Sequence, residues 1–217
     1  MEQEAVTFDK TIISAAASIS IELPGASIPH FRTYLHALRQ WNRVINLTAI
    51  NEPEEVIIKH FVDSLAGLKQ LEVTGTTKIL DVGSGAGFPS LPLKIVRPEV
   101  QVCLLEPNQK KCAFLRYIIG VLNMGDAQVV SRGIEDYVMQ PEVQGMFDYV
   151  VVRAYKVTGR GNLLASLLND RGKLILFRSA KTERDFALSS LALVDEVEYE
   201  LPSGYGHRVL SIFQKVP

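Results

Sequence analysis

Cysteine and histidine are both scarce in this 217-residue sequence. The two cysteines, Cys103 and Cys112, form no C-x-x-C pair, so they supply neither a disulfide framework nor a structural zinc site, and they suit a reducing cytosol. The four histidines have no metal-ligand spacing; they are His30, His36, His60 and His207. We therefore expect a protein without a metal site.

Long hydrophobic runs are also missing. The sequence has no stretch of about 18 uninterrupted apolar residues, which argues against a membrane-spanning helix. Residues 12–21 faintly resemble the hydrophobic part of a signal peptide, but three of them are serine and the preceding residues are mainly acidic. We therefore expect a cytoplasmic protein with no membrane partner.

Neither sign of charge dominates, because 23 Lys and Arg face 24 Asp and Glu, which gives a net charge of −1. The distribution is uneven. The segment from Arg153 to Arg184 holds eight basic and two acidic residues, a balance of +6, which leaves −7 for the rest. One basic side on a mildly acidic body suits a phosphate-rich partner. The candidate contacts on it are Lys156, Arg160, Arg178 and Lys181.

Glycine, in contrast, is concentrated at one informative place. Gly83, Gly85 and Gly87 stand at alternate positions directly after the apolar run 79–82 and shortly before a predicted helix. Glycines at this spacing leave no side chain between the backbone and a ligand. The free N–H groups at the start of the helix favour a polar or anionic group. The pattern predicts a nucleotide-like cofactor at this turn.

Two departures from the dinucleotide fingerprint indicate which cofactor binds. That fingerprint is G-x-G-x-x-G, whereas this turn is G-x-G-x-G and continues with Phe88. In addition, Asp81 precedes the turn, where a carboxylate would crowd a pyrophosphate but would suit a cationic amino group. Both departures favour S-adenosylmethionine over NAD.

The next predicted strand supports a nucleoside ligand. The apolar run 100–105 ends in Glu106, nineteen residues after Gly87. An acid at this distance, at the tip of the second strand, is placed to bond both hydroxyls of a ribose.

The chain changes its periodicity after about residue 70. Before that point, Phe31, Tyr34, Leu35 and Leu38 follow the spacing of an amphipathic helix, and Pro53 opens a second helix. We therefore expect an N-terminal helical segment, residues 1–70, packed on a core domain, residues 71–217.

The core domain alternates strands and helices, which is typical of a parallel sheet covered on both faces. Strands are expected at 78–82, 100–106, 127–131, 147–152 and 172–177. Helices are expected at 89–97, 108–123, 133–140, 159–169 and 181–190. A terminal hairpin, 195–201 with 208–214, completes an α/β fold like the mainly parallel seven-stranded sheet of the Rossmann-like class I methyltransferases.

Several motifs resemble one family, the bacterial small-subunit ribosomal RNA guanine-N7 methyltransferase G, also called glucose-inhibited division protein B. They cover most of the chain. The motifs are Trp41-Asn42, Asn46-Leu47-Thr48, His60-Phe61-Val62-Asp63-Ser64, the Asp81–Pro89 turn, residues 92–98, Lys110-Lys111, residues 114–116, residues 131–135 and Val152-Arg153-Ala154.

This resemblance implies a role for individual residues. Gly83, Gly85 and Phe88 would line the cofactor, together with Asp81. Glu106 would hold the ribose, and Ile134 and Glu135 would border the adenine. Arg153 would lie at the junction of cofactor and target and is the candidate catalytic residue. The implied partner is 16S rRNA or the small ribosomal subunit, the implied target is a guanine in the 530-loop region, and we expect a monomer.

Two positions depart from the family pattern. Val152 stands where the family usually has serine, and Arg178-Ser179 stands where it usually has a lysine–glycine pair. Arg178 brings the same charge with a different geometry, because a planar guanidinium does not replace an ammonium simply.

The absence of a nucleophile–base constellation fits this chemistry, because guanine N7 carries a lone pair and no proton.

Three alternatives stay open. A class I methyltransferase could act on another RNA base, a small molecule or a protein amine, and an amine acceptor would need a base near Arg153. An NAD-dependent dehydrogenase would be revealed by cofactor competition, and a non-catalytic RNA-binding module by RNA binding without methyl transfer.

Overall fold

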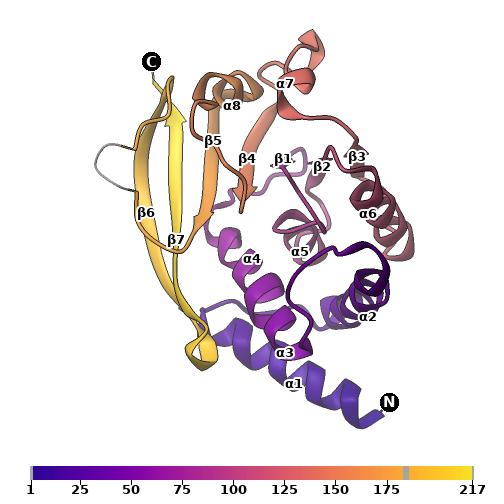
Figure 1. Ribbon diagram of the computed structural model, residues 1–217. Coiled ribbons are helices and arrows are strands. Elements are labelled where there is room, and N and C mark those ends of the chain that lie inside the picture. Colours follow the sequence, from indigo (N-terminus) through magenta and orange to yellow (C-terminus); the bar gives the residue numbers. More distant parts are fainter. Residues whose placement is uncertain (1, 183–185, 217) are drawn as a thin grey trace.

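The computed structural model describes residues 2–182 and 186–216, and it contains a seven-stranded sheet (Figure 1). The strand order is β3-β2-β1-β4-β5-β7-β6. The strands are β1 (Lys78–Val82), β2 (Gln101–Leu105), β3 (Ala127–Val130), β4 (Phe147–Arg153), β5 (Leu168–Arg178), β6 (Leu191–Leu201) and β7 (Gly206–Lys215). The strands β1 to β5 are parallel to one another, and β7 pairs antiparallel with both β5 and β6. The predicted strand pattern is confirmed.

Helices connect the parallel strands and cover both faces of the sheet. The connecting helices are α5 (Ser90–Val96), α6 (Gln109–Val121), α7 (Ile134–Tyr137) and α8 (Gly161–Leu167). Side chains alternate along each strand: Ile79 packs in one apolar cluster with the N-terminal helices and α6, whereas Leu80 packs in a second cluster with α7 and α8. A sheet that is buried on both faces explains why its strands read as continuous apolar runs.

The N-terminal segment is helical, as its periodicity predicts. Its elements are α1 (Glu2–Ser18), α2 (Ile28–Ile45), α3 (Pro53–Val56), a π-helical turn (Ile57–Val62), α4 (Asp63–Leu65) and a 3₁₀ turn (Ala66–Gln70). Phe31 and Tyr34 of α2 are fully buried and belong to the same cluster as strand residues Ile79 and Val102. Figure 1 shows α1 across the end of the molecule that also holds the β6–β7 turn. The segment therefore shares its core with the sheet.

One expected helix is wrong, and several element boundaries shift. Residues 181–182 and 186–190 are not helical, while 183–185 lie outside the described residues. Leu188 instead makes an antiparallel bridge with Leu191, where β6 begins four residues earlier than expected. Strand pairing explains the change, because β6 runs antiparallel to β7 along eleven residues. Similarly, β5 begins at Leu168 and shortens α8.

None of the helices in the described ranges has the length and hydropathy that a membrane crossing requires.

Candidate active site

Three strand tips bring polar side chains to one edge of the sheet. Asp81 is near the end of β1, Glu106 follows β2, and Arg153 ends β4. The strands β2, β1 and β4 are adjacent and parallel, so their carboxyl ends meet at one edge, where ligands of open α/β sheets bind. The fold therefore places these three predicted site residues at the same edge of the sheet.

The glycine turn has the backbone conformation that its sequence predicts. Gly83 and Gly85 have φ angles of +72° and +59°, which L side chains rarely adopt. The backbone N–H groups of Gly83 and Ser84 donate to the carbonyl of Leu105, at 2.9 and 3.2 Å, and fasten the turn to β2. A Cβ placed on Gly85 would meet no atom nearer than the Gly83 carbonyl at 3.9 Å. The turn is therefore rigid, and it is open at Gly85.

Asp81 is fully buried beside this turn. Its Oδ2 accepts a hydrogen bond from the Ser90 N–H at 3.0 Å, while Oδ1 has no partner among the described residues. Burial raises the pKa of Asp81 to about 7, against the opposing effects of the Ser90 hydrogen bond and of Arg153. A buried acceptor without a partner is costly, so this oxygen favours a donor or a cation supplied by a ligand.

Glu106 is held on both sides. Its Oε2 accepts from the Gly85 N–H at 2.9 Å, and its Oε1 accepts from the Asn108 N–H at 2.9 Å. The Asn108 side chain in turn caps α6 by accepting from Lys110 and Lys111. The carboxylate thus links the glycine turn to the start of α6 and has a fixed orientation.

Arg153 is bound to the N-terminal helical segment. Its Nη1 donates to Asp63 Oδ2 at 3.2 Å and to the Lys59 carbonyl at 3.1 Å, and its Nη2 donates to His60 Nδ1 at 2.9 Å. The guanidinium carbon lies 5.1 Å from the centroid of the Phe88 ring, a cation–π distance. Arg153 therefore joins the tip of β4 to the π-helical turn.

His60 is a neutral member of this network. Burial first, and the charge of Arg153 second, lower the pKa of His60 to about 3. Because arginine only donates, Nδ1 must accept, and the proton is on Nε2, which lies 2.8 Å from Thr48 Oγ1. Asn42 fixes Thr48 through two hydrogen bonds of 2.9 Å with its backbone. The network runs from α2 to β4 by way of the π-helical turn, a feature that is frequent at functional sites.

The side chain of Phe88 packs against residues of the N-terminal helices. It is 5% exposed and stacks on Tyr34 and His60, with ring centroids at 5.4 and 4.6 Å. The Tyr34 hydroxyl also donates to the Ala86 carbonyl within the turn. Phe88 therefore supports the turn from the side of the N-terminal helices.

Ile134 and Glu135 begin α7, after β3. Ile134 is buried in the same cluster as Leu105, whereas Glu135 is exposed and accepts from Arg160 Nε at 2.8 Å. The apolar residue faces the core, and the acid faces the loop after β4.

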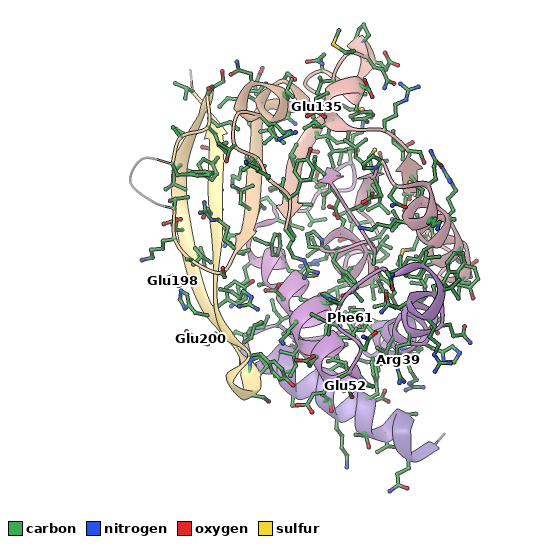
Figure 2. The ribbon with its side chains drawn as sticks, in the orientation of Figure 1. Arg39, Glu52, Phe61, Glu135, Glu198 and Glu200 are labelled. Atoms are coloured by element: carbon green, nitrogen blue, oxygen red, sulfur yellow. The ribbon has the colours of Figure 1, made fainter. Side chains whose placement is uncertain are left out.

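Most of the candidate RNA contacts have partners within the protein. Lys156 is exposed, but Arg160 pairs with Glu135, and Lys181 pairs with Glu198 at 2.6 Å. Arg178 covers the Phe186 ring at 4.7 Å. Figure 2 shows Glu198 along the outer strand β6. Because these acids lie outside the segment 153–184, the balance of +6 overstates its local charge; Arg184 lies outside the described residues.

Sequence reasoning did not assign Asp63, His60 or Tyr199 to the site. Asp63 Oδ1 accepts from the Tyr199 hydroxyl at 2.7 Å, while Oδ2 accepts from Arg153. Arg153 and Tyr199 are far from Asp63 in the chain, and only the folded structure brings the three together. A signal was present, because His60 and Asp63 belong to one of the motifs that carry the family resemblance.

Within residues 2–182 and 186–216, no three His, Cys, Asp or Glu side chains come together as metal ligands.

Comparison with known proteins identifies the family. The family model described as rRNA small subunit methyltransferase G matches residues 27–203. The chain belongs to this family. Similar members are named Ribosomal RNA small subunit methyltransferase G. The one from Lactococcus lactis subsp. cremoris SK11 is 32% identical over 94% of this chain and 89% of its own length. The one from Geotalea uraniireducens is 33% identical over 97% and 98%. The expected family, and with it the class of rRNA methyltransferase, is confirmed.

Solved structures confirm the fold. A SAM-dependent methyltransferase from Aquifex aeolicus has a TM-score of 0.58 at 13% identity, covering 79% of this chain and 97% of its own. TYW2 of M. jannaschii, in complex with AdoMet, has a TM-score of 0.53 at 16% identity, covering 71% and 77%. The core of the G family member described here is thus a mainly parallel methyltransferase sheet.

Proposed function

We propose that this protein transfers a methyl group from S-adenosylmethionine to N7 of a guanine in the 530-loop region of 16S rRNA. One observation carries the proposal. A rigid glycine turn, open at Gly85, lies between the unpartnered Oδ1 of Asp81 and the fixed carboxylate of Glu106. Membership of the G family supplies the class of substrate.

The residues at this edge fit the proposed cofactor. Asp81 Oδ1 would hold the cationic amino group. The lone pairs of Glu106 that are not used by Gly85 and Asn108 would accept the ribose hydroxyls. Ile134 and Glu135, at the start of α7, would border the adenine. Phe88 would contribute to cofactor binding indirectly, by holding the glycine turn in its conformation. S-adenosylmethionine, when bound, supplies an electrophilic methyl group on a positively charged sulfur.

The target explains why this edge needs no general base. Guanine N7 has an in-plane lone pair and no proton to remove. The protein then has to place the acceptor in line with the methyl group, and such orientation is worth roughly 7–11 kcal/mol in favourable cases. Arg153 is always charged and already bonded to Asp63 and His60, so it would position groups at the junction of cofactor and target and would carry no proton.

The RNA contacts follow from the distribution of ion pairs. Lys156 is exposed and would contact phosphate directly. Arg178, whose Nη1 is buried and whose guanidinium covers the Phe186 ring, would first have to turn toward the RNA. Arg160 and Lys181 would have to exchange Glu135 and Glu198 for phosphate. This exchange would make their contributions smaller.

The setting of the reaction follows from the substrate. We propose that the protein works in the cytoplasm, as a monomer, on 16S rRNA or on the small ribosomal subunit. We also propose that residues 1–70 form a helical segment that stays packed on the domain 71–217, because both contribute to one apolar cluster.

The decisive experiment maps the methyl group. Unmodified small subunits and naked 16S rRNA are incubated separately with the protein and labelled S-adenosylmethionine, and the product is located by mass spectrometry. We expect one label on N7 of a 530-loop guanine. Label on another base or on a protein would replace the target. RNA binding without any transfer would favour the non-catalytic module.

A further inference from the structure

Tyr155, the second residue after β4, lies against the glycine turn. A Cβ placed on Gly83 would come within 2.8 Å of Tyr155 Cδ2 and 3.2 Å of its Cγ. The aromatic ring therefore packs directly on the face of Gly83 that has no side chain. Glycine at this position allows close approach of another group, and in this structure that group is the Tyr155 ring.

Arg160 holds the ring in place. Its guanidinium carbon lies 5.4 Å from the centroid of the Tyr155 ring, a cation–π distance. Its Nε donates to Glu135 Oε1 at 2.8 Å, and its Nη1 donates to the Lys156 carbonyl at 3.1 Å. Arg160 thus ties the loop after β4 to α7, which follows β3.

The backbone around Tyr155 turns sharply at two points. Ala154 and Gly159 have φ angles of +56° and +77°, on either side of residues 155–158. Alanine rarely adopts this left-handed conformation, because its Cβ crowds the backbone. The segment 154–160 is therefore a short strap that is folded back by two unusual residues and held by the Arg160–Glu135 pair.

One open groove of the structure lies away from the glycine turn. A groove of about 1180 Å³ lies between α1, α2 and α3, and Arg39 and Glu52 line it. Figure 2 shows these two residues among the N-terminal helices, at a distance from Glu135. No residue of the glycine turn lines this groove. The face of the turn at Gly83 is covered by the Tyr155 ring.

We propose that Tyr155 covers the cofactor-binding face of the glycine turn, and that the Arg160–Glu135 ion pair latches it there. This inference rests on the proposed function. A ring in van der Waals contact with Gly83 leaves no layer for a ligand between the two. The cofactor therefore binds to a minor population in which the ring has left the turn, and its apparent affinity is reduced by that population.

Binding measurements on variants test the cover. S-adenosylmethionine association is followed by stopped flow, and its affinity by calorimetry. If the uncovered state is about one tenth of the population, Tyr155→Ala binds on the order of tenfold tighter, mainly through faster association. Arg160→Met loses the latch and also associates faster. Tyr155→Phe keeps the ring, and Thr158→Ala changes an exposed residue of the same strap, so both bind like the unmodified protein.

A second measurement needs no ligand. Hydrogen exchange of the backbone amides at 154–160 is compared between the unmodified protein and Arg160→Met. We expect several-fold faster exchange in the variant, since the latch is lost. Unchanged exchange would overturn the latch.

The outcomes separate this inference from the function on which it rests. If the unmodified protein binds S-adenosylmethionine and Tyr155→Ala binds it equally or more weakly, the covering role is wrong and the proposed function stands. If the unmodified protein does not bind this ligand at all, the proposed function is wrong and the covering role is overturned with it.

Discussion

Arg153, at the tip of β4, donates to the carboxylate of Asp63, which lies ninety residues earlier, at 3.2 Å. The two side chains are only 14% and 7% exposed. Tyr199 donates to the other oxygen of Asp63, and Arg208 lies 3.6 Å from that oxygen. A single buried carboxylate therefore joins the N-terminal segment, β4 and the terminal hairpin.

Removing Asp63 should destabilise the whole fold. Asp63→Ala leaves Arg153 buried with one partner fewer, and breaking a buried ion pair typically costs about 3–5 kcal/mol. Chemical denaturation measures the difference in the free energy of unfolding. Glu198→Ala is the matched control, because its pairs with Lys181 and His207 are exposed, and a much smaller loss is expected there. Equal losses in the two variants would contradict the joining role of Asp63.

Cofactor affinity should rise with pH through the titration of Asp81. Burial raises the pKa of Asp81 to about 7, so the carboxyl is mostly protonated at pH 6 and mostly ionised at pH 7.5. A cationic amino group binds the ionised form, and a free α-amino group stays charged below a pKa of about 7.7. Affinity for S-adenosylmethionine should therefore increase roughly fivefold from pH 6 to pH 7.5, because the gain in ionised Asp81 is partly offset by loss of charge on the amino group, as calorimetry would show.

The control for this dependence is Asp81→Asn. It should bind more weakly than the unmodified protein at pH 7.5 and lose the pH dependence, because the amide does not titrate. A variant that keeps the full pH dependence would place the titrating group elsewhere.

Acid should weaken the fold through His60. The pKa of His60 is about 3 in the folded protein and near 6.5 in an unfolded chain. Between these values the unfolded state binds more protons, so stability is present above pH 6.5 and is lost as the pH falls. At pH 5 the loss is roughly 2 kcal/mol relative to pH 7.

His60→Gln isolates this contribution, because the opposite effect of Asp81 is common to both proteins and cancels in the difference. Urea unfolding at pH 5 and pH 7 should show the unmodified protein losing about 2 kcal/mol more than the variant. The same loss in both proteins would mean that His60 is already charged or exposed.

RNA binding should depend steeply on salt. Each phosphate contact by Lys or Arg contributes about one unit to the slope of log K against log salt. Lys156→Ala and Arg178→Ala should each lower that slope by about one, in filter-binding titrations with 16S rRNA fragments. Lys173→Ala serves as a control, because Lys173 pairs with Glu72 and lies before the carboxyl edge of β5. A salt-independent affinity would remove the basic segment from the interface.

Local sequence patterns predicted much of the fold, because short segments of the chain determine several helices, strands and turns by themselves. The apolar runs of β1 and β2 and the glycines at 83 and 85 determine a strand–turn–helix unit whatever the rest of the chain does. Glu106 was predictable for the same reason, since its position follows from the length of one βα unit. Boundaries were less predictable where pairing between distant strands decides them, as at Leu191 and Leu168.

The partners of the site residues could not be predicted in the same way. That Arg153 bonds His60 and Asp63 depends on how the N-terminal segment packs on the sheet, and no spacing in the sequence encodes it. The net charge of the basic segment overstated its local positive charge for a related reason. Glu135 and Glu198 approach Arg160 and Lys181 only in the folded chain.

Both oxygens of Glu106 accept backbone N–H groups, one from the glycine turn and one from the cap of α6. These two hydrogen bonds fix the orientation of the carboxylate, so it cannot rotate to follow a sugar bound in a different position. For the ribose proposed to bind here, this fixed carboxylate would select among nucleosides by the positions of their hydroxyls.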